Sequence, residues 1–507
     1  MTKTNSSRLA KNSLYMYVRM ILSMIIALYS SRMLLKTIGV EGYGIYSVVG
    51  SVISVVSLLQ FFFSFTTQRF LNYEMGKSNS NKLQLIFNMS IIVNLVISIL
   101  FIIIVEIVGY YFFEYKINVP LERYDAAIWV FHISVISAVV MIMASPYDAL
   151  ILANEKFNFY AFTSILKNLL NLIIIFFIPL SECDSLIFYA ILLLLVQAII
   201  MMISFIYCNS KFQESKFKLM WNKMVFKQLL SFAGWQLLGT SASSLTQGGL
   251  NLLFNVFGGP IVNAARGISY QLNGLIHQFI NNANSAITPY CIKASAQGDN
   301  YNLFRMFFFS SKAYLAISFS ISVPIIYMSE YLLKIWLGTF PEYTIGFVSI
   351  VLLCSIIKSL HIPIDLLFKS VGVIKQYQIA DGIILSLPLL ASYFLLKNGF
   401  SVYVALFSTV VFEFIDLIAI LYIAKNICKL DIKKYFRQVL SYLFISLFIG
   451  TLGYFLNISY GHDWYISLFL SISVLFFVLP LIYKFSFENS ERDIVMMLFK
   501  KVFIKRY

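Results

Sequence analysis

The chain has 507 residues, of which 60% are hydrophobic and only 12% are charged, and its mean hydropathy is +0.82. These values exclude an ordinary water-soluble protein, although the length alone would allow two or three soluble domains. The formal net charge of +15 comes from basic residues dispersed along the chain, which suits loops that meet anionic lipid headgroups rather than nucleic acid. The composition therefore predicts a protein that crosses a membrane many times.

Apolar runs long enough to cross a bilayer recur from one end of the chain to the other. About 20 apolar residues span the roughly 30 Å of hydrocarbon in a membrane. Hydropathy on this basis predicts about fourteen transmembrane helices. They cover residues 12–35, 44–65, 83–112, 125–147, 157–180, 185–208, 229–254, 262–290, 305–328, 344–368, 376–396, 402–424, 438–457 and 464–483.

The basic residues give these helices an orientation, because short loops rich in Lys and Arg stay in the cytoplasm. Residues 211–227 hold five Lys and residues 425–437 hold five basic residues, whereas the predicted outside loops "LSECDS" and "NVFGGP" hold no Lys or Arg. An even number of spans then places both termini in the cytoplasm. The first apolar run lacks a small-residue cleavage site, so we interpret it as an uncleaved span.

A repeated motif indicates that the chain consists of two similar halves. "SPYDALILANEK" contains Pro146 and Asp148, and "IPIDLLFKSVGVIK" contains Pro363 and Asp365, so the two Pro-x-Asp pairs lie 217 residues apart. We interpret both aspartates as caps of backbone donors near a loop. Because six is an even number of spans, two six-helix lobes would enter the membrane in the same orientation and enclose a central cavity. The predicted divisions are a first lobe at 1–210, a second at 211–430, two further helices at 431–484 and a basic cytoplasmic tail at 485–507.

A stripe of polar and aromatic side chains follows one face of the predicted helix at 262–290. The positions advance in steps of three or four, which places them on a single helical face. We interpret this face as the wall of a hydrophilic cavity, although amides that bond between packed helices are a common alternative in membranes. The stripe comprises residues 263, 266, 270, 273, 277, 281, 284 and 288, and the preceding span adds residues that include Gln236 and Gln247.

Basic residues inside the spans point to an anionic ligand. Lys167 and Lys358 lie near the middle of their spans, where a lipid-facing charge costs roughly 2.5 to 3.5 kcal/mol. Arg19, Arg32 and Arg266 lie at other depths, so these residues could form a ladder of positive charge across the membrane. The predicted substrate-binding residues are Arg19, Arg32, Lys167, Gln236, Gln247, Arg266, Asn273, His277, Asn281 and Lys358.

Alternative roles remain open for these cations. Lys167 could pair with a buried acid, while Arg32 or Lys358 could extend to the membrane surface or cap a carbonyl. His277 fits a satisfied core histidine as well as a cavity group. The acids available to Lys167 within predicted spans are Glu106, Asp381, Glu413 and Asp416.

Catalytic and cofactor-binding motifs are not evident. The sequence contains no nucleotide-binding Gly-rich loop and no HExxH pair, and the five cysteines form no CxxC pair. We therefore expect a transporter rather than an enzyme, with no cofactor and no metal site. A coupling ion, Na+ or H+, is compatible with this class, but the sequence identifies no site for one. Lysines at mid-depth favour an anionic substrate such as a pyrophosphate, which such side chains bind through charge-assisted hydrogen bonds.

Several segments resemble the polysaccharide-transporter branch of the multidrug, oligosaccharidyl-lipid and polysaccharide exporter superfamily. The resemblance covers nearly the whole chain, is most specific at residues 230–300 and is weaker after about residue 400. It implies that basic residues of the central cavity bind the substrate at Arg19, Arg32 and Arg266, whereas Lys167 and Lys358 rest on their depth alone. The segments are "NSLYMYVRMILSMIIALYSSRMLLKTIGVEGYGIYSVVG", "TTQRFLNYEMG", "FAGWQLLGTSASSLTQGGLNLLFNVFGGPIVNAARGISYQLN" and "ITPYCIKASAQGD".

The resemblance also implies a function. It predicts a flippase in the bacterial inner membrane that moves a polyprenyl-pyrophosphate-linked oligosaccharide to the periplasmic leaflet by alternating access. The product would serve a surface polysaccharide such as O-antigen of lipopolysaccharide, capsule or exopolysaccharide. Expected partners are this lipid-linked substrate, membrane lipids, and a polysaccharide polymerase with other assembly proteins. Two alternatives are a multidrug antiporter of the same superfamily and a membrane-embedded glycan polymerase or ligase.

Overall fold

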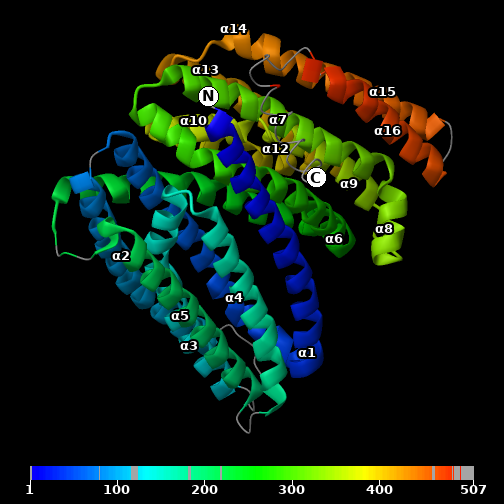
Figure 1. The fold of residues 1–507 in the computed structure, drawn as a ribbon. Helices are drawn as coiled ribbons and strands as arrows, with labels where there is room; N and C mark the ends of the chain where they lie inside the picture. Colours follow the sequence, from blue (N-terminus) through cyan, green and yellow to red (C-terminus); the bar gives the residue numbers. More distant parts are fainter. Residues whose placement is uncertain are drawn as a thin grey trace, which may run out of the picture. The chain divides into compact units, whose positions relative to one another are not determined.

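The computed structural model describes residues 3–78, 80–115, 124–180, 184–216, 218, 220–459, 463–481, 483–484 and 492. Within these residues the chain forms helices and their connecting turns, with no β-strand (Figure 1). The all-α prediction is therefore confirmed.

Ten helical stretches among the described residues are long and apolar enough to cross a membrane. They coincide with the third to sixth and the ninth to fourteenth predicted spans. The other four predicted spans lie within two long helices, α1 (Lys3–Gly76) and α6 (Lys223–Ala296), so the count of fourteen stays a prediction. The ten stretches are Lys82–Tyr111, Tyr124–Ala153, Phe157–Leu180, Ser185–Lys211, Asn300–Tyr327, Thr344–Val371, Lys375–Lys397, Val402–Cys428, Ile432–Ser459 and Trp464–Leu481.

Helix α6 is interrupted at Gly259, which has φ +74° and ψ −178°. Side chains with a Cβ atom are strongly disfavoured in this region of backbone space, so glycine is the residue that permits the break. The break lies in "NVFGGP", which the sequence predicts to be a loop between two spans. Each part of α6 has about 36 residues and is about 54 Å long at 1.5 Å per residue, which exceeds the hydrocarbon thickness of a bilayer.

We expect Gly259→Ala to lower the free energy of unfolding by about 1–3 kcal/mol, because alanine is strained at this φ and ψ. No atom lies within 4 Å of an added Cβ, so the effect should be conformational rather than steric. Thermal unfolding of purified protein in detergent measures it. Gly274→Ala, in the same helix with equally open surroundings and no positive φ, is the control and should be neutral or slightly stabilising. Equal melting temperatures for the two variants would contradict the inference that the backbone at Gly259 requires glycine.

The chain divides into two compact units, one of residues 11–237 and one of residues 1–10 with 238–507. The first contains most of α1, and α3 packs against α2 and α5 in it, around buried residues that include Phe101, Val130, Ile142 and Leu186. The predicted domain limits stay predictions. Besides α1, the unit of residues 11–237 contains α2 (Ser80–Tyr115), α3 (Tyr124–Ala153), α4 (Phe157–Phe177) and α5 (Ser185–Lys211).

In the second unit, α13 (Val402–Cys428) packs against five other helices, α9, α10, α11, α12 and α14. Helix α16 packs against α7 and α15, and the Tyr327 hydroxyl donates a 2.6 Å hydrogen bond to the carbonyl of Gly450 in α15. The elements are α7 (Asn300–Tyr327), α8 (Ser329–Leu337), α9 (Thr344–Lys358), α10 (His361–Val371), α11 (Lys375–Ile384), α12 (Leu387–Lys397), α14 (Ile432–Tyr435), η4 (Phe436–Leu440), α15 (Ser441–Ser459) and α16 (Trp464–Leu481).

Two of these spans are broken near their middle by proline. Pro363 has no N–H for the carbonyl four residues earlier, and α9 ends just before that position, at Lys358. Pro388 likewise has no N–H for the carbonyl of Ile384, and α11 ends at Ile384. Irregular backbone at membrane depth is tolerated where it is buried in protein or lines a cavity. The breaks therefore indicate where in this unit a polar site can be built.

Candidate functional site

Arg266 is buried on the second part of α6, with only 2% of its surface exposed. Its terminal nitrogens donate hydrogen bonds to the side-chain oxygens of Asn251 and Gln247, the latter at 2.5 Å, and its guanidinium carbon lies 4.5 Å from the centroid of the Tyr270 ring. Both acceptors belong to the first part of α6, so the break at Gly259 brings the two parts together. Because these acceptors are neutral amides, the bonds hold the guanidinium in place without cancelling its charge.

A cavity of about 50 Å³ lies between α6, α9, α13 and the break that precedes α12, and its lining includes Gln247 and Tyr270, two neighbours of Arg266. A water molecule needs about 10–15 Å³ by this measure, so the cavity holds roughly three or four waters. Its polar lining includes Gln247, Tyr270, Asn273, Lys358 and Glu413. Three predicted site residues, Gln247, Asn273 and Lys358, are thus brought together.

Lys358 is the last residue of α9 and lies where that span breaks. The strongest electrostatic interaction of its ammonium is with Glu413 on α13, and Asp381 on α11 contributes a weaker one. His277, another predicted site residue, also lies within the electrostatic range of Lys358. The mid-membrane lysine is therefore partly balanced by a carboxylate within its own unit, which was not among the roles that the sequence left open for Lys358.

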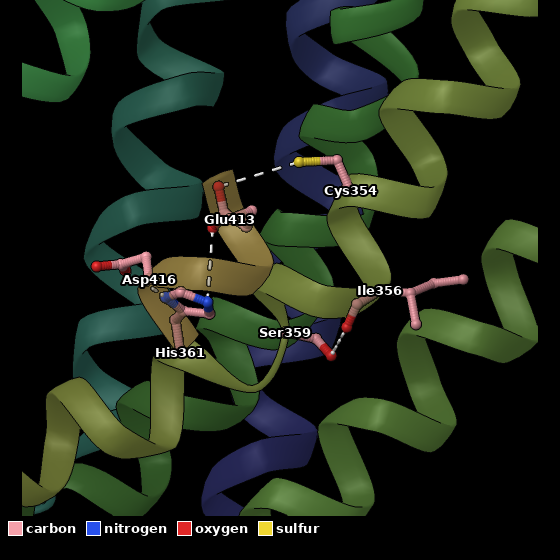
Figure 2. A network of polar contacts seen from close by, with 6 residues as sticks. All are labelled: Cys354, Ile356, Ser359, His361, Glu413 and Asp416. Carbon is pink, nitrogen blue, oxygen red and sulfur yellow. Dashed lines mark hydrogen bonds and ion pairs between the residues drawn. The ribbon is translucent and has the colours of Figure 1, made fainter. Parts of the chain in front are cut away.

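Glu413 also belongs to a buried cluster of polar and charged groups that includes Cys354, His361 and Asp416 (Figure 2). His361 Nε2 lies 3.8 Å from Glu413 Oε1, and His361 Nδ1 lies 3.2 Å from Asp416 Oδ2. Cys354 donates through its thiol to Glu413 Oε2 at 4.0 Å. Asp381 completes the cluster, since its carboxylate lies within 4.8 Å of ligand atoms of His361 and Asp416. Asp416 is fully buried.

These acids change one inference drawn from the sequence. We expected lysines at mid-depth in place of buried carboxylates, whereas this unit contains both. Glu413 and Asp416 are three residues apart within an apolar span and share a helical face, and such intramembrane acids are functional candidates by themselves. That spacing was the signal available in the sequence. What it could not give was His361 and Asp381, which reach the same point from other helices.

The first unit contains a smaller polar network. The guanidinium carbon of Arg19 on α1 lies 5.2 Å from the centroid of the Tyr160 ring. Lys167 on α4 interacts electrostatically with Asp148 on α3, and Gln60 donates a 3.4 Å hydrogen bond to the same carboxylate. Each of the two units thus has a mid-span lysine beside an acid.

Two predictions about acids are wrong in detail. The neighbour of Lys167 is Asp148 rather than one of the four acids named from the sequence, and Glu106 lies 3.0 Å from His132 instead. Asp148 also lies inside α3, where its described contacts are to side chains and not to backbone donors. Asp365, its counterpart in the second half, lies 2.7 Å from Lys369 in an ion pair within α10.

The remaining predicted site residues are scattered. Gln236 is 2% exposed, and neither of its amide atoms has a hydrogen bond among the described residues. Asn281 is exposed on α6. The side chain of Arg32 lies outside the described residues. A continuous ladder of positive charge stays a prediction.

The fold is shared with known membrane transporters. The structure matches a mutant form of a MATE with a TM-score of 0.73 and 12% identity, over 83% of this chain and 98% of the other. It matches a MATE in complex with MaD3S with a TM-score of 0.72 and 13% identity, over 85% and 100%. A third match is a transporter of the MOP superfamily from Pyrococcus furiosus, whose report describes reverse polarity of its binding pocket. Its TM-score is 0.71 and its sequence identity 12%, over 84% of this chain and 98% of the other. The fold is thus that of a multi-pass membrane transporter.

The sequence identifies the family more narrowly. Residues 9–295, more than half of the chain, match the model of a family described as "Polysaccharide biosynthesis protein". The chain therefore belongs to this polysaccharide biosynthesis family, and its fold is similar to that of MOP superfamily transporters. No curated protein matches it.

Proposed function

We propose that the protein is a flippase for polyprenyl-pyrophosphate-linked oligosaccharide in the bacterial inner membrane, and that it supplies surface polysaccharide assembly by alternating access. The observation that carries this proposal is Arg266, a buried guanidinium held by two neutral amides, one of which, Gln247, lines a hydrophilic cavity. A cation fixed in this way is preorganised for an anion, because its donors are oriented and its charge is not cancelled.

Lys358 and Lys167 contribute differently in this proposal. Each has a carboxylate neighbour, so each would alternate between that acid and the pyrophosphate during the cycle. The cavity of about 50 Å³ is too small for an oligosaccharide and would accept only part of an anionic headgroup. The sugars would then lie outside this cavity.

A multidrug antiporter is a second candidate, and the buried acids favour it. Glu413, Asp416 and Asp381 could compensate a cationic drug or exchange an ion for it. On that hypothesis the arginine would be structural, and drug export would persist without it. The two candidates therefore differ in which charges transport requires.

We expect purified protein in proteoliposomes to move a labelled polyprenyl-pyrophosphate glycan between leaflets at least about tenfold faster than protein-free vesicles. Accessibility of the label to a membrane-impermeant reagent measures the transfer. A parallel assay follows efflux of a cationic dye from the same vesicles. Dye efflux without glycolipid transfer would support the antiporter, and lengthened glycan chains would reveal a polymerase or ligase.

A further inference from the structure

The segment of residues 211–227, which connects α5 to α6, exposes all five of its lysines. Its single acid, Glu214, is partly buried. Within the described part of the chain none of these lysines forms an ion pair. The segment therefore presents a strong excess of positive charge to its surroundings. The lysines are Lys211, Lys216, Lys218, Lys223 and Lys227.

Exposed apolar side chains lie among these lysines. Trp221 is 63% exposed and Met224 is 71% exposed, and the ring centroid of Trp221 lies 5.1 Å from that of Phe226. Tryptophan is typical of the boundary between membrane and water, where its ring lies at the level of the lipid headgroups. Lysines combined with such side chains are the composition of a surface that binds an anionic membrane.

The segment lies next to the lipid-facing surface of its two helices. On α5 the last large apolar side chain that is exposed is Ile206, five residues before Lys211, which is about 7.5 Å along a helix. On α6 such side chains resume at Leu230, three residues after Lys227. Both ends of the segment are thus close to the hydrocarbon boundary, so its lysines lie at headgroup level.

Side chains of α2 hold the segment in a defined conformation. Gln84 Nε2 donates a 3.0 Å hydrogen bond to the carbonyl of Lys216, and the backbone N–H of Lys218 donates to Asn88 Oδ1 at 2.9 Å. The Asn222 side chain accepts from two backbone N–H groups in the first turn of α6, at 3.0 and 3.1 Å. A surface that is ordered in advance loses less conformational entropy when it binds.

We propose that residues 211–227 form a docking surface for anionic phospholipid headgroups of the adjoining membrane leaflet. The ammonium groups bind lipid phosphates through charge-assisted hydrogen bonds, and Trp221 and Met224 enter the interface beside them. Lysines that serve only to orient a protein during insertion require neither a fixed loop nor an exposed tryptophan. This proposal does not depend on the proposed function, because phospholipid surrounds the protein whatever its cargo is.

Tryptophan fluorescence can measure which lipid lies beside Trp221. The full-length protein is reconstituted in phosphatidylcholine with about 20% phosphatidylglycerol, and either lipid carries bromine, a quencher, near the headgroup end of its acyl chains. Subtracting the signal of Trp221→Phe removes the other four tryptophans of the chain. We expect phosphatidylglycerol at Trp221 to exceed its share of the bilayer at least about threefold. The excess should decline in about 1 M NaCl, where the Debye length is about 3 Å.

A triple variant tests whether the lysines cause this enrichment. Lys218→Gln/Lys223→Gln/Lys227→Gln should reduce phosphatidylglycerol at Trp221 to its share of the bilayer. Lys425→Gln/Lys429→Gln/Lys433→Gln is the matched control, because it removes three exposed lysines from the segment that follows α13, and it should leave the enrichment unchanged. Elution volume and melting temperature verify folding. Wild-type enrichment in the first triple variant, or loss in the control alone, contradicts the proposal.

Other occupants of the surface give different results. Quenching of Trp221 in proportion to the bilayer composition would show an unselective interface and overturn the proposal. Inorganic pyrophosphate and an acidic peptide, each added at constant ionic strength, should leave the enrichment unchanged; displacement of phosphatidylglycerol by either would identify a soluble anion or a protein as the occupant. Glycolipid transfer without enrichment would contradict the docking surface alone, and enrichment without transfer would contradict the proposed function alone.

Discussion

Replacing Arg266 by Gln is expected to reduce glycolipid transfer in proteoliposomes at least about 100-fold. The guanidinium is buried and donates to two amide oxygens, so the substitution removes the positive charge and leaves Asn251 and Gln247 without their donor. Hydrogen bonds to charged groups contribute about 1.5–3 kcal/mol each, and about 2.7 kcal/mol corresponds to 100-fold. Initial transfer rates measure the effect.

Arg266→Lys separates charge from geometry. Lysine keeps the charge but lacks the planar fork that serves two acceptors and stacks on Tyr270, so we expect partial activity at best. Gln271→Ala, at an exposed position on the same helix, is the control and should transfer at the wild-type rate. Glycolipid transfer at the wild-type rate in Arg266→Gln would contradict the role of Arg266. Dye efflux by Arg266→Gln, with no glycolipid transfer by the wild type, would remove the flippase proposal and leave the antiporter.

The second large effect concerns Lys358 and Glu413. Lys358→Gln should lower the free energy of unfolding by about 3–5 kcal/mol, because it leaves a buried carboxylate without its main counter-charge. The double variant Lys358→Gln/Glu413→Gln removes both charges and should recover most of that stability. Transport should be lost in both, since neither retains the cation at the cavity. Unfolding in detergent and transfer assays on the same preparations separate these two outcomes.

An exposed pair supplies the matched control. Lys334 and Glu330 on α8 form an ion pair of 2.7 Å at the protein surface, where such pairs contribute at most about 1 kcal/mol. Lys334→Gln should therefore leave both stability and transport nearly unchanged. If Lys358→Gln behaved like Lys334→Gln, or if the double variant were no more stable than the single one, the interaction of Lys358 with Glu413 would not be structurally important.

The apolar spans were predictable because each depends on the composition of one continuous segment. Ten predicted spans recur as helices, and the loop at "NVFGGP" recurs as the break at Gly259. The breaks after Lys358 and Ile384 were also within reach, because Pro363 and Pro388 each remove the backbone donor that would continue the helix. Local chemistry was sufficient for these features.

Contacts between segments were not predictable in the same way. The interaction of Lys167 with Asp148 and the meeting of His361, Asp381 and Asp416 depend on how several helices pack, which hydropathy and spacing do not determine. The stripe on α6 was correct as a helical face, but Asn281 is exposed while Arg266 is buried. A helical face that is polar along its whole length thus packs against different neighbours at different positions.

The match to the polysaccharide biosynthesis family ends at residue 295, and every member of the acidic cluster lies beyond it, between residues 361 and 416. Arg19, Lys167 and Arg266 lie within the matched part. Substitutions in the later helices can therefore change these buried acids while the segments that define the family stay constant. A protein recognised by the same family model need not contain these acids.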